Sequence, residues 1–173
     1  IDENIAYIGC NNGTILKTVN GGNNWIKYSD STMDYYQTLH FINSMTGFGA
    51  GLSRTSGSSI KKTTNGGLNW NYVNAPNIFT IFDLTFPTAS TGYASTKTGT
   101  FAKTTDSGLN WFQPGIFESF AAGGLYFVND NTGFWVGSSY ISNAQIRKTT
   151  NGGYNWSETL LDSIEVLYDI EFK

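Results

Sequence analysis

The feature that most constrains this chain is a nine-residue phrase that occurs four times. The copies read KTVNGGNNW, KTTNGGLNW, KTTDSGLNW and KTTNGGYNW, and they end at Trp25, Trp70, Trp111 and Trp156. The copies therefore lie 41 to 45 residues apart along the chain. A phrase that recurs at a nearly constant period of this size indicates one supersecondary unit copied in tandem.

Each copy predicts four short antiparallel strands. Four segments with alternating apolar residues end in phenylalanine, at Phe41, Phe86, Phe127 and Phe172. The first three each precede a copy of the phrase, and the fourth follows the last copy. Alternation of this kind predicts a strand, and the glycine-rich stretches between segments predict turns. Four such strands in about 43 residues are typical of a β-propeller blade. The fold class predicted is therefore all-β, with four blade equivalents in the chain.

The phase of the repeat sets the expected blade boundaries. We expect one propeller domain, or a propeller segment, over 1–173, with blade 1 at 1–29 plus 166–173. Blades 2, 3 and 4 are expected at 34–74, 78–114 and 120–160. The C-terminal strand then completes the first blade or a blade of a neighbouring chain. Three contexts remain open: a ring closed by this chain alone, two chains that share blades, or a piece of a longer propeller.

Composition narrows the classes of function. Charged residues make up 13% of the chain and the net charge is -3, so nucleic acid is not an expected partner. No apolar run is long enough to predict a membrane span. The single Cys10 excludes an internal disulfide and the single His40 excludes a multi-histidine metal site, so we expect no metal and no cofactor. The chain opens without a signal-peptide pattern or an initiator Met, and we expect it to be mature, trimmed or excised from a longer protein.

The phrase itself reads as a turn. In its second copy the Asn65 side chain can accept hydrogen bonds from the backbone ahead of it, and the Thr63 hydroxyl can close the turn from the other side. Gly66 and Gly67 allow positive φ, and Trp70 supplies a large apolar face between sheets. Each residue type in the phrase therefore has a structural task.

This pattern resembles the Asp-box, or BNR repeat. It is carried by Thr18, Asn20, Gly22, Trp25, Thr63, Asn65, Gly67, Trp70, Thr104, Asp106, Gly108, Trp111, Thr149, Asn151, Gly153 and Trp156, with Asn in place of Asp in three copies. The whole repeat is similar to photosystem II assembly-factor-type propellers and to secreted bacterial Asp-box proteins. The resemblance implies that these residues are structural and lie at the outer edge of the blades. It also implies an extracellular or cell-envelope location.

The resemblance further implies that ligands meet the face opposite the phrase, which is built by the loops between blades and by the loops between the second and third strands of each blade. Aromatic and basic side chains in or beside these loops are the candidates for ligand binding: Tyr35, Tyr36, Arg54, Phe79, Phe117 and Tyr140. Three polar residues of the innermost strands, His40, Asp83 and Asp169, are expected to face a central channel.

The candidate residues indicate which kinds of function the chain could perform. Sialidases clamp a carboxylate with three arginines, and this chain has only Arg54 and Arg147, so no catalytic residue is assigned. We expect a non-catalytic binding or scaffolding module that recognises protein or glycan through its loop face. The alternatives are a fragment of an Asp-box glycoside hydrolase and a structural subunit of an extracellular assembly. Another copy of the chain, or the rest of a longer propeller, is a further expected partner.

Overall fold

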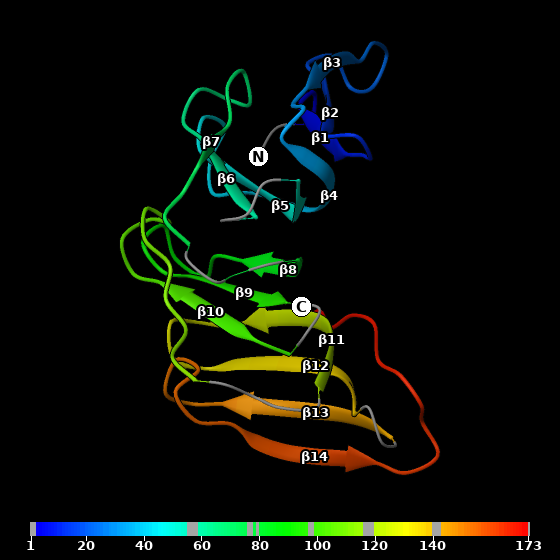
Figure 1. The fold of residues 1–173 in the computed structure, drawn as a ribbon, viewed down its shortest axis with the longest axis vertical. Helices are drawn as coiled ribbons and strands as arrows, with labels where there is room; N and C mark the ends of the chain where they lie inside the picture. Colours follow the sequence, from blue (N-terminus) through cyan, green and yellow to red (C-terminus); the bar gives the residue numbers. More distant parts are fainter. Residues whose placement is uncertain are drawn as a thin grey trace. The chain divides into compact units, whose positions relative to one another are not determined.

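The structure is a computed structural model that describes residues 3–54, 59–75, 78, 80–96, 99–115, 120–139 and 143–172. These residues form strands and turns, with no helix among them (Figure 1). The strands make four antiparallel sheets of three or four strands each. The chain divides into two compact units, Ile1–Ile81 and Phe82–Lys173, and each holds two sheets.

Unit 1 contains the first two sheets. The first has the order β1-β2-β3, with β1 at Ala6–Gly9, β2 at Thr14–Thr18 and β3 at Ile26–Ser29. The second has the order β4-β5-β6-β7, with β4 at Met33–Phe41, β5 at Gly47–Ser53, β6 at Ile60–Thr63 and β7 at Asn71–Tyr72. The all-β prediction is confirmed, and the first sheet has three strands among the described residues.

Unit 2 contains the other two sheets. One has β8 at Ile81–Thr85, β9 at Gly92–Thr96 and β10 at Phe101–Thr104. Its expected fourth strand is reduced to a single bridge between Lys103 and Phe112. The other has β11 at Phe120–Phe127, β12 at Gly133–Ser139, β13 at Ala144–Thr149 and β14 at Ser157–Leu161.

Aromatic side chains fill the space between the sheets of each unit. In unit 2 the rings of Tyr93 and Phe127 stack with centroids 3.5 Å apart. In unit 1 the rings of Tyr7 and Phe41 stack at 4.0 Å. Each pair joins the second strand of one repeat to the phenylalanine that ends the inner strand of the next repeat. The recurring phenylalanine therefore holds successive sheets together through ring contact and apolar burial.

The turn in each phrase has the hydrogen bonds that its residue types predict. The Thr63 hydroxyl donates to Asn65 Oδ1 at 3.0 Å and accepts the N–H of Gly67 at 2.9 Å. Asn65 Oδ1 also accepts the N–H of Asn69 at 3.0 Å. The same bonds recur in the other three copies, where the threonines are Thr18, Thr104 and Thr149. Asn and Asp are interchangeable here because the turn uses only a side-chain acceptor oxygen.

The lysine that opens the phrase joins neighbouring sheets. Lys17 Nζ donates to the carbonyl oxygen of Gly66 at 2.6 Å, and Tyr7 donates its hydroxyl to the same oxygen at 2.9 Å. In unit 2, Lys103 Nζ donates to the carbonyl oxygen of Gly152 at 3.1 Å. The glycine carbonyl of one turn is thus bound by the lysine of the preceding repeat.

The C-terminal segment differs from its prediction. A strand was expected over 166–173, but residues 164–172 are assigned to no strand. The segment lies against β11, where a side chain on Gly123 would collide with the carbonyl oxygen of Leu167. A strand needs a ladder of backbone hydrogen bonds, and this packing supplies contact without a ladder.

Candidate functional site

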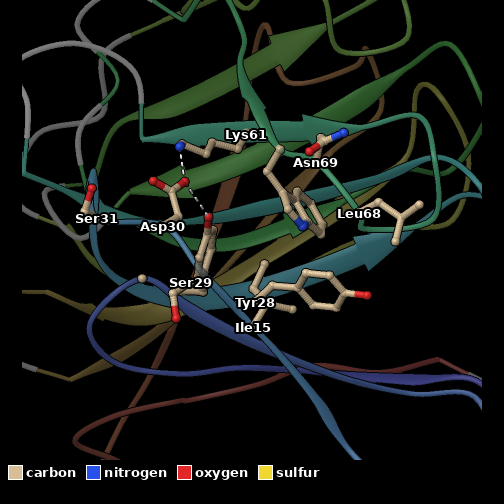
Figure 2. Close-up of a pocket in the computed structure, with 11 residues that line it drawn as sticks. Ile15, Tyr28, Ser29, Asp30, Ser31, Lys61, Leu68 and Asn69 are labelled. Atoms are coloured by element: carbon tan, nitrogen blue, oxygen red, sulfur yellow. Dashed lines mark hydrogen bonds and ion pairs between the residues drawn. The ribbon is translucent and has the colours of Figure 1, made fainter.

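A pocket of about 340 Å³ lies between the two sheets of unit 1 (Figure 2). Its wall comes from the loop between β1 and β2, from β2, β3 and β4, from the loop between β3 and β4, from β6, and from the turn between β6 and β7. The lining residues are Gly13, Ile15, Tyr28, Ser29, Asp30, Ser31, Tyr36, Lys61, Leu68, Asn69 and Trp70. This volume lies in the range of small-molecule and side-chain pockets.

The polar end of the pocket is an ion pair between Asp30 and Lys61. Figure 2 shows the Asp30 carboxylate between the Lys61 ammonium and a tyrosine hydroxyl, which is that of Tyr36 at 3.3 Å. Lys61 also donates to the Thr32 hydroxyl at 2.8 Å, and its Nζ lies 4.2 Å from the centre of the Tyr72 ring. Lys61 is only 4% exposed, so these groups take the place of water around its ammonium group.

The Asp30–Lys61 pair affects the pKa values of Asp30 and Tyr36. Burial acts to raise the pKa of Asp30, but hydrogen bonds from Lys61 and Thr32 and the charge of Lys61 outweigh it, so the pKa is lowered. Burial, together with the Asp30 charge and hydrogen bond, raises the pKa of Tyr36. Asp30 is therefore ionised at neutral pH and Tyr36 stays protonated as a hydrogen-bond donor.

The other end of the pocket is apolar. Ile15 is buried, while Leu68 is 55% exposed at the rim. Trp70 lies beside them and donates its indole N–H to the Gly67 carbonyl at 3.2 Å, which fixes the plane of its ring. The pocket thus joins an aliphatic and aromatic wall to an internally neutral polar end.

The predicted ligand-binding residues are only partly brought together. Tyr36 lines the pocket, but the residue is only 4% exposed and packs in the core with Met33. Tyr35 does not line the pocket and forms a bridge with Asn11. Arg54 also lies outside the pocket wall, where it donates to Asp34 at 2.6 Å. The remaining three candidates, Phe79, Phe117 and Tyr140, lie outside the residues that the structure describes.

The three polar residues expected to face a channel have different surroundings. Asp83 accepts the N–H of Leu84 and, from the next inner strand, the N–H of Leu125, both at 2.8 Å. Asp169 accepts the N–H of Ile170 at 2.8 Å. Burial lowers the pKa of His40, so this residue is neutral at neutral pH. The two hydrogen bonds to Asp83 give it a structural task between sheets, and the channel itself stays a prediction.

Sequence reasoning missed most of the pocket wall. Lys61 precedes the recurring lysine at a position that is apolar in the first and third copies (Leu16 and Ala102) and cationic in the fourth (Arg147), so a cation at this position was a usable signal shared by Lys61 and Arg147. Leu68, Asn69 and Trp70 were passed over because the phrase was read as structural throughout. In the second copy the first residues, from Thr63 to Gly67, close the turn. The last three residues of the same copy line the pocket.

Within the described ranges, no His, Cys, Asp and Glu side chains gather in a group that could hold a metal ion. None of the described segments forms a helix with the length and hydropathy needed to cross a membrane. The pocket is thus the feature of the described residues on which a functional argument can be built.

Comparisons with known proteins identify the fold. No family model and no curated protein matches the sequence. A structure of YCF48 bound to D1 peptide matches 94% of this chain and 51% of that chain, with a TM-score of 0.69 and 16% identity. YCF48 from Cyanidioschyzon merolae matches 98% of this chain and 56% of its own, with a TM-score of 0.71 and 13% identity.

A GH74 xyloglucanase from Xanthomonas campestris matches 92% of this chain and 28% of its own, with a TM-score of 0.70 and 11% identity. The chain thus spans about half of the YCF48 chains and about a quarter of the GH74 chain. Likeness at this level of identity shows the fold alone. The sheets of this chain are blades of the β-propeller type.

Proposed function

We propose that this chain is a non-catalytic binding module that holds a short peptide segment at the pocket of unit 1. The observation that carries the proposal is the position of the pocket beside a strand edge. Strand β3 pairs with β2 on one side, and among the described residues it has no strand on the other. Tyr28 and Ser29 belong both to this strand and to the pocket wall. An extended peptide could add to the edge of β3 and place one side chain in the pocket.

The pocket chemistry suits an apolar side chain with a polar backbone. Ile15, Leu68 and Trp70 offer apolar contact, while Ser29 and Asn69 offer donors and acceptors at the rim. The Asp30–Lys61 pair is internally neutral, so it attracts neither an acid nor a base strongly. We therefore expect an uncharged aliphatic or aromatic side chain to occupy the pocket.

Hydrolysis of a glycan is less well supported by the same geometry. Glycoside hydrolysis uses two carboxyl groups, one of which must hold its proton near neutral pH. Asp30 is the one acid in the pocket wall, and its lowered pKa and its pairing with Lys61 keep it ionised. Among the similar structures, YCF48 is described with a bound peptide, which supports the peptide alternative by analogy.

The experiment compares two matched leucine variants. Leu68 and Leu109 hold the same position in successive copies of the turn and are 55% and 57% exposed, but only Leu68 lines the pocket. Random dodecapeptides displayed on phage would be selected on the immobilised chain, and the enriched peptides measured by calorimetry. Loss of one buried leucine contact corresponds to about a tenfold or greater rise in Kd, so Leu68→Asp should show it. Leu109→Asp should bind as the parent chain does.

Two results would overturn the proposal. One is equal binding of the enriched peptides by both variants, which would place the peptide elsewhere. The other is binding of xyloglucan oligosaccharides that Leu68→Asp abolishes, with no peptide enriched at all. The second result would assign the pocket to glycans.

A further inference from the structure

The hydrogen-bonding pattern of strand β3 follows from a bond just beyond its end. Asp30 donates its backbone N–H to the Gly13 carbonyl at 2.9 Å, and these two residues continue the register of the β2–β3 pair. In an antiparallel pair, opposed residues that exchange backbone hydrogen bonds alternate with opposed residues that do not. Counting back from Asp30, Tyr28 directs its backbone groups toward β2, whereas Ser29 and Lys27 direct theirs away from it.

The next repeat has the same pattern. Val73 is the third residue after the tryptophan of its phrase, as Tyr28 is in the first copy. Val73 donates its backbone N–H to the Ile60 carbonyl at 3.2 Å. Tyr28 lies opposite Ile15, which holds the same place in the first copy as Ile60 in the second. The direction of the backbone groups in β3 is therefore a property of the repeat.

Lys27 and Ser29 present backbone donors and acceptors along the edge of β3 that faces away from β2. Both residues are exposed, and among the described residues β3 has no neighbouring strand on this side. Tyr28, which lies between them, belongs to the pocket wall. Because successive side chains of a strand point to opposite faces, the Lys27 side chain points away from the face that Tyr28 shares with the pocket. A strand added here would meet backbone groups at two alternate residues and the pocket at the residue between them.

We infer, resting on the peptide-binding function proposed above, that the peptide adds antiparallel to β3 with its anchor residue opposite Tyr28. The anchor is the residue whose side chain enters the pocket. Directly opposed residues share a face, and their side chains lie closest in pairs without hydrogen bonds, so the anchor side chain begins on the pocket face beside Tyr28. The residue before the anchor then exchanges backbone bonds with Ser29, and the residue after it with Lys27.

The antiparallel direction agrees with the rest of the chain. Every strand pair whose register is described is antiparallel. Antiparallel pairing is also slightly more stable per residue than parallel pairing. In parallel addition the anchor itself would bond to Lys27 and Ser29, and its two neighbours would direct their N–H groups away from β3. The two directions therefore use different N–H groups of the peptide.

This register defines the class of partner. The residues on both sides of the anchor need their N–H groups, which excludes proline at these two positions. Lys27 lies opposite the residue after the anchor, so an acidic side chain there should bind about two- to fivefold more tightly than a basic one. The partner is thus an extended segment in which an apolar residue is followed by an acidic one, with no proline on either side of the anchor.

The first test scans the tightest-binding dodecapeptide of the phage selection with single N-methyl groups. The anchor is identified beforehand as the residue whose replacement by alanine makes binding insensitive to Leu68→Asp. Methylation of either neighbour should raise Kd about tenfold or more, because a backbone hydrogen bond is lost, whereas methylation of the anchor should change Kd by less than about twofold. The reverse pattern would assign parallel addition and overturn the inference.

Charge reversal tests the direction from the side of the chain. Glutamate after the anchor should bind the parent chain more tightly than lysine at that position, and Lys27→Glu should reverse the order, each by about two- to fivefold. The same exchange before the anchor serves as the control and should be insensitive to Lys27→Glu. Reversal at the position before the anchor, in place of the one after it, would contradict the antiparallel register.

Amide hydrogen exchange separates the register from the function. In the chain without peptide the Tyr28 N–H should exchange slowly and the Lys27 and Ser29 N–H groups rapidly, and peptide should slow these two. If no enriched peptide depends on Leu68, the proposed function fails and the register fails with it. If such a peptide binds but leaves the exchange of Lys27 and Ser29 unchanged, only the register fails. Equal exchange of Tyr28 and Ser29 in the chain alone would overturn the bonding pattern without any peptide.

Discussion

Removal of a single hydroxyl tests the turn chemistry on which the repeat depends. Thr63 is 1% exposed, and its hydroxyl accepts the Gly67 N–H at 2.9 Å while donating to Asn65 Oδ1 at 3.0 Å. Thr63→Val keeps the shape of the side chain and deletes both of these bonds, together with the longer one that the hydroxyl accepts from the Asn65 N–H at 3.3 Å. A buried N–H left without a partner costs about 1–3 kcal/mol, and a lost neutral bond about 0.5–1.5 kcal/mol. We therefore expect a loss of about 2–3 kcal/mol from the free energy of unfolding.

The assay is equilibrium unfolding in urea, followed by tryptophan fluorescence. The midpoint should fall while the dependence on urea concentration stays the same, since the native fold is kept. Thr38→Val is the control, because Thr38 lies in β4 and makes no side-chain hydrogen bond with the described residues. If Thr63→Val cost no more than Thr38→Val, the hydroxyl would not hold the turn, and the physical account of the repeat would be wrong.

Three further predictions concern charge and backbone. Burial acts to raise the pKa of Asp106, but hydrogen bonds from its own turn lower it from 3.8 to about 2, so the stabilisation by its ionised form is full above 3.8 and lost as the pH falls toward 2. Asp106→Asn should remove that part of the acid dependence in a pH series of unfolding curves. Gly153 has φ +86 and faces an aromatic ring, so Gly153→Ala should cost about 2–4 kcal/mol of stability in thermal unfolding. Gly21 has φ +64, but a Cβ added there would have no atom nearer than 3.8 Å, so Gly21→Ala should cost only about 1–2 kcal/mol. Lys61→Ala leaves the partly buried Asp30 carboxylate without its cation and should cost about 3–5 kcal/mol of stability, against about 0–1 kcal/mol for Arg54→Ala at an exposed pair. Similar losses for the two variants would show that the Asp30–Lys61 pair is not the buried ion pair described above.

Most of the fold could be predicted because its signals are local. The bonds that close each turn join residues two to four positions apart, such as Thr63 with Asn65 and Gly67. The strands on either side follow from alternation of apolar residues, which needs no knowledge of distant contacts. The third repeat shows the limit of this reasoning. Its phrase matches the others, yet its outer strand is reduced to the bridge between Lys103 and Phe112.

The pocket could not be predicted in the same way. Asp30 lies in the loop between β3 and β4 and Lys61 lies in β6, and the sequence alone does not show that these two segments meet. Tyr36 was predicted to bind ligand because it lies in or beside a loop of the expected binding face. In the structure the residue is part of the core, and only its hydroxyl reaches Asp30. Whether a side chain is buried depends on how two sheets pack, and the sequence of either sheet alone does not determine that packing.

The repeat, the chemistry of its turns and the number of blade equivalents can all be inferred from the order of the residues. Each of these depends on hydrogen bonds and side-chain alternation within a few residues. Three other features are visible only in the folded chain: the second copy of the phrase lines a pocket, Lys17 and Lys103 bind the turn of the following repeat, and segment 166–172 packs on β11. These contacts form between neighbouring sheets, so their partners are fixed only when the sheets pack together.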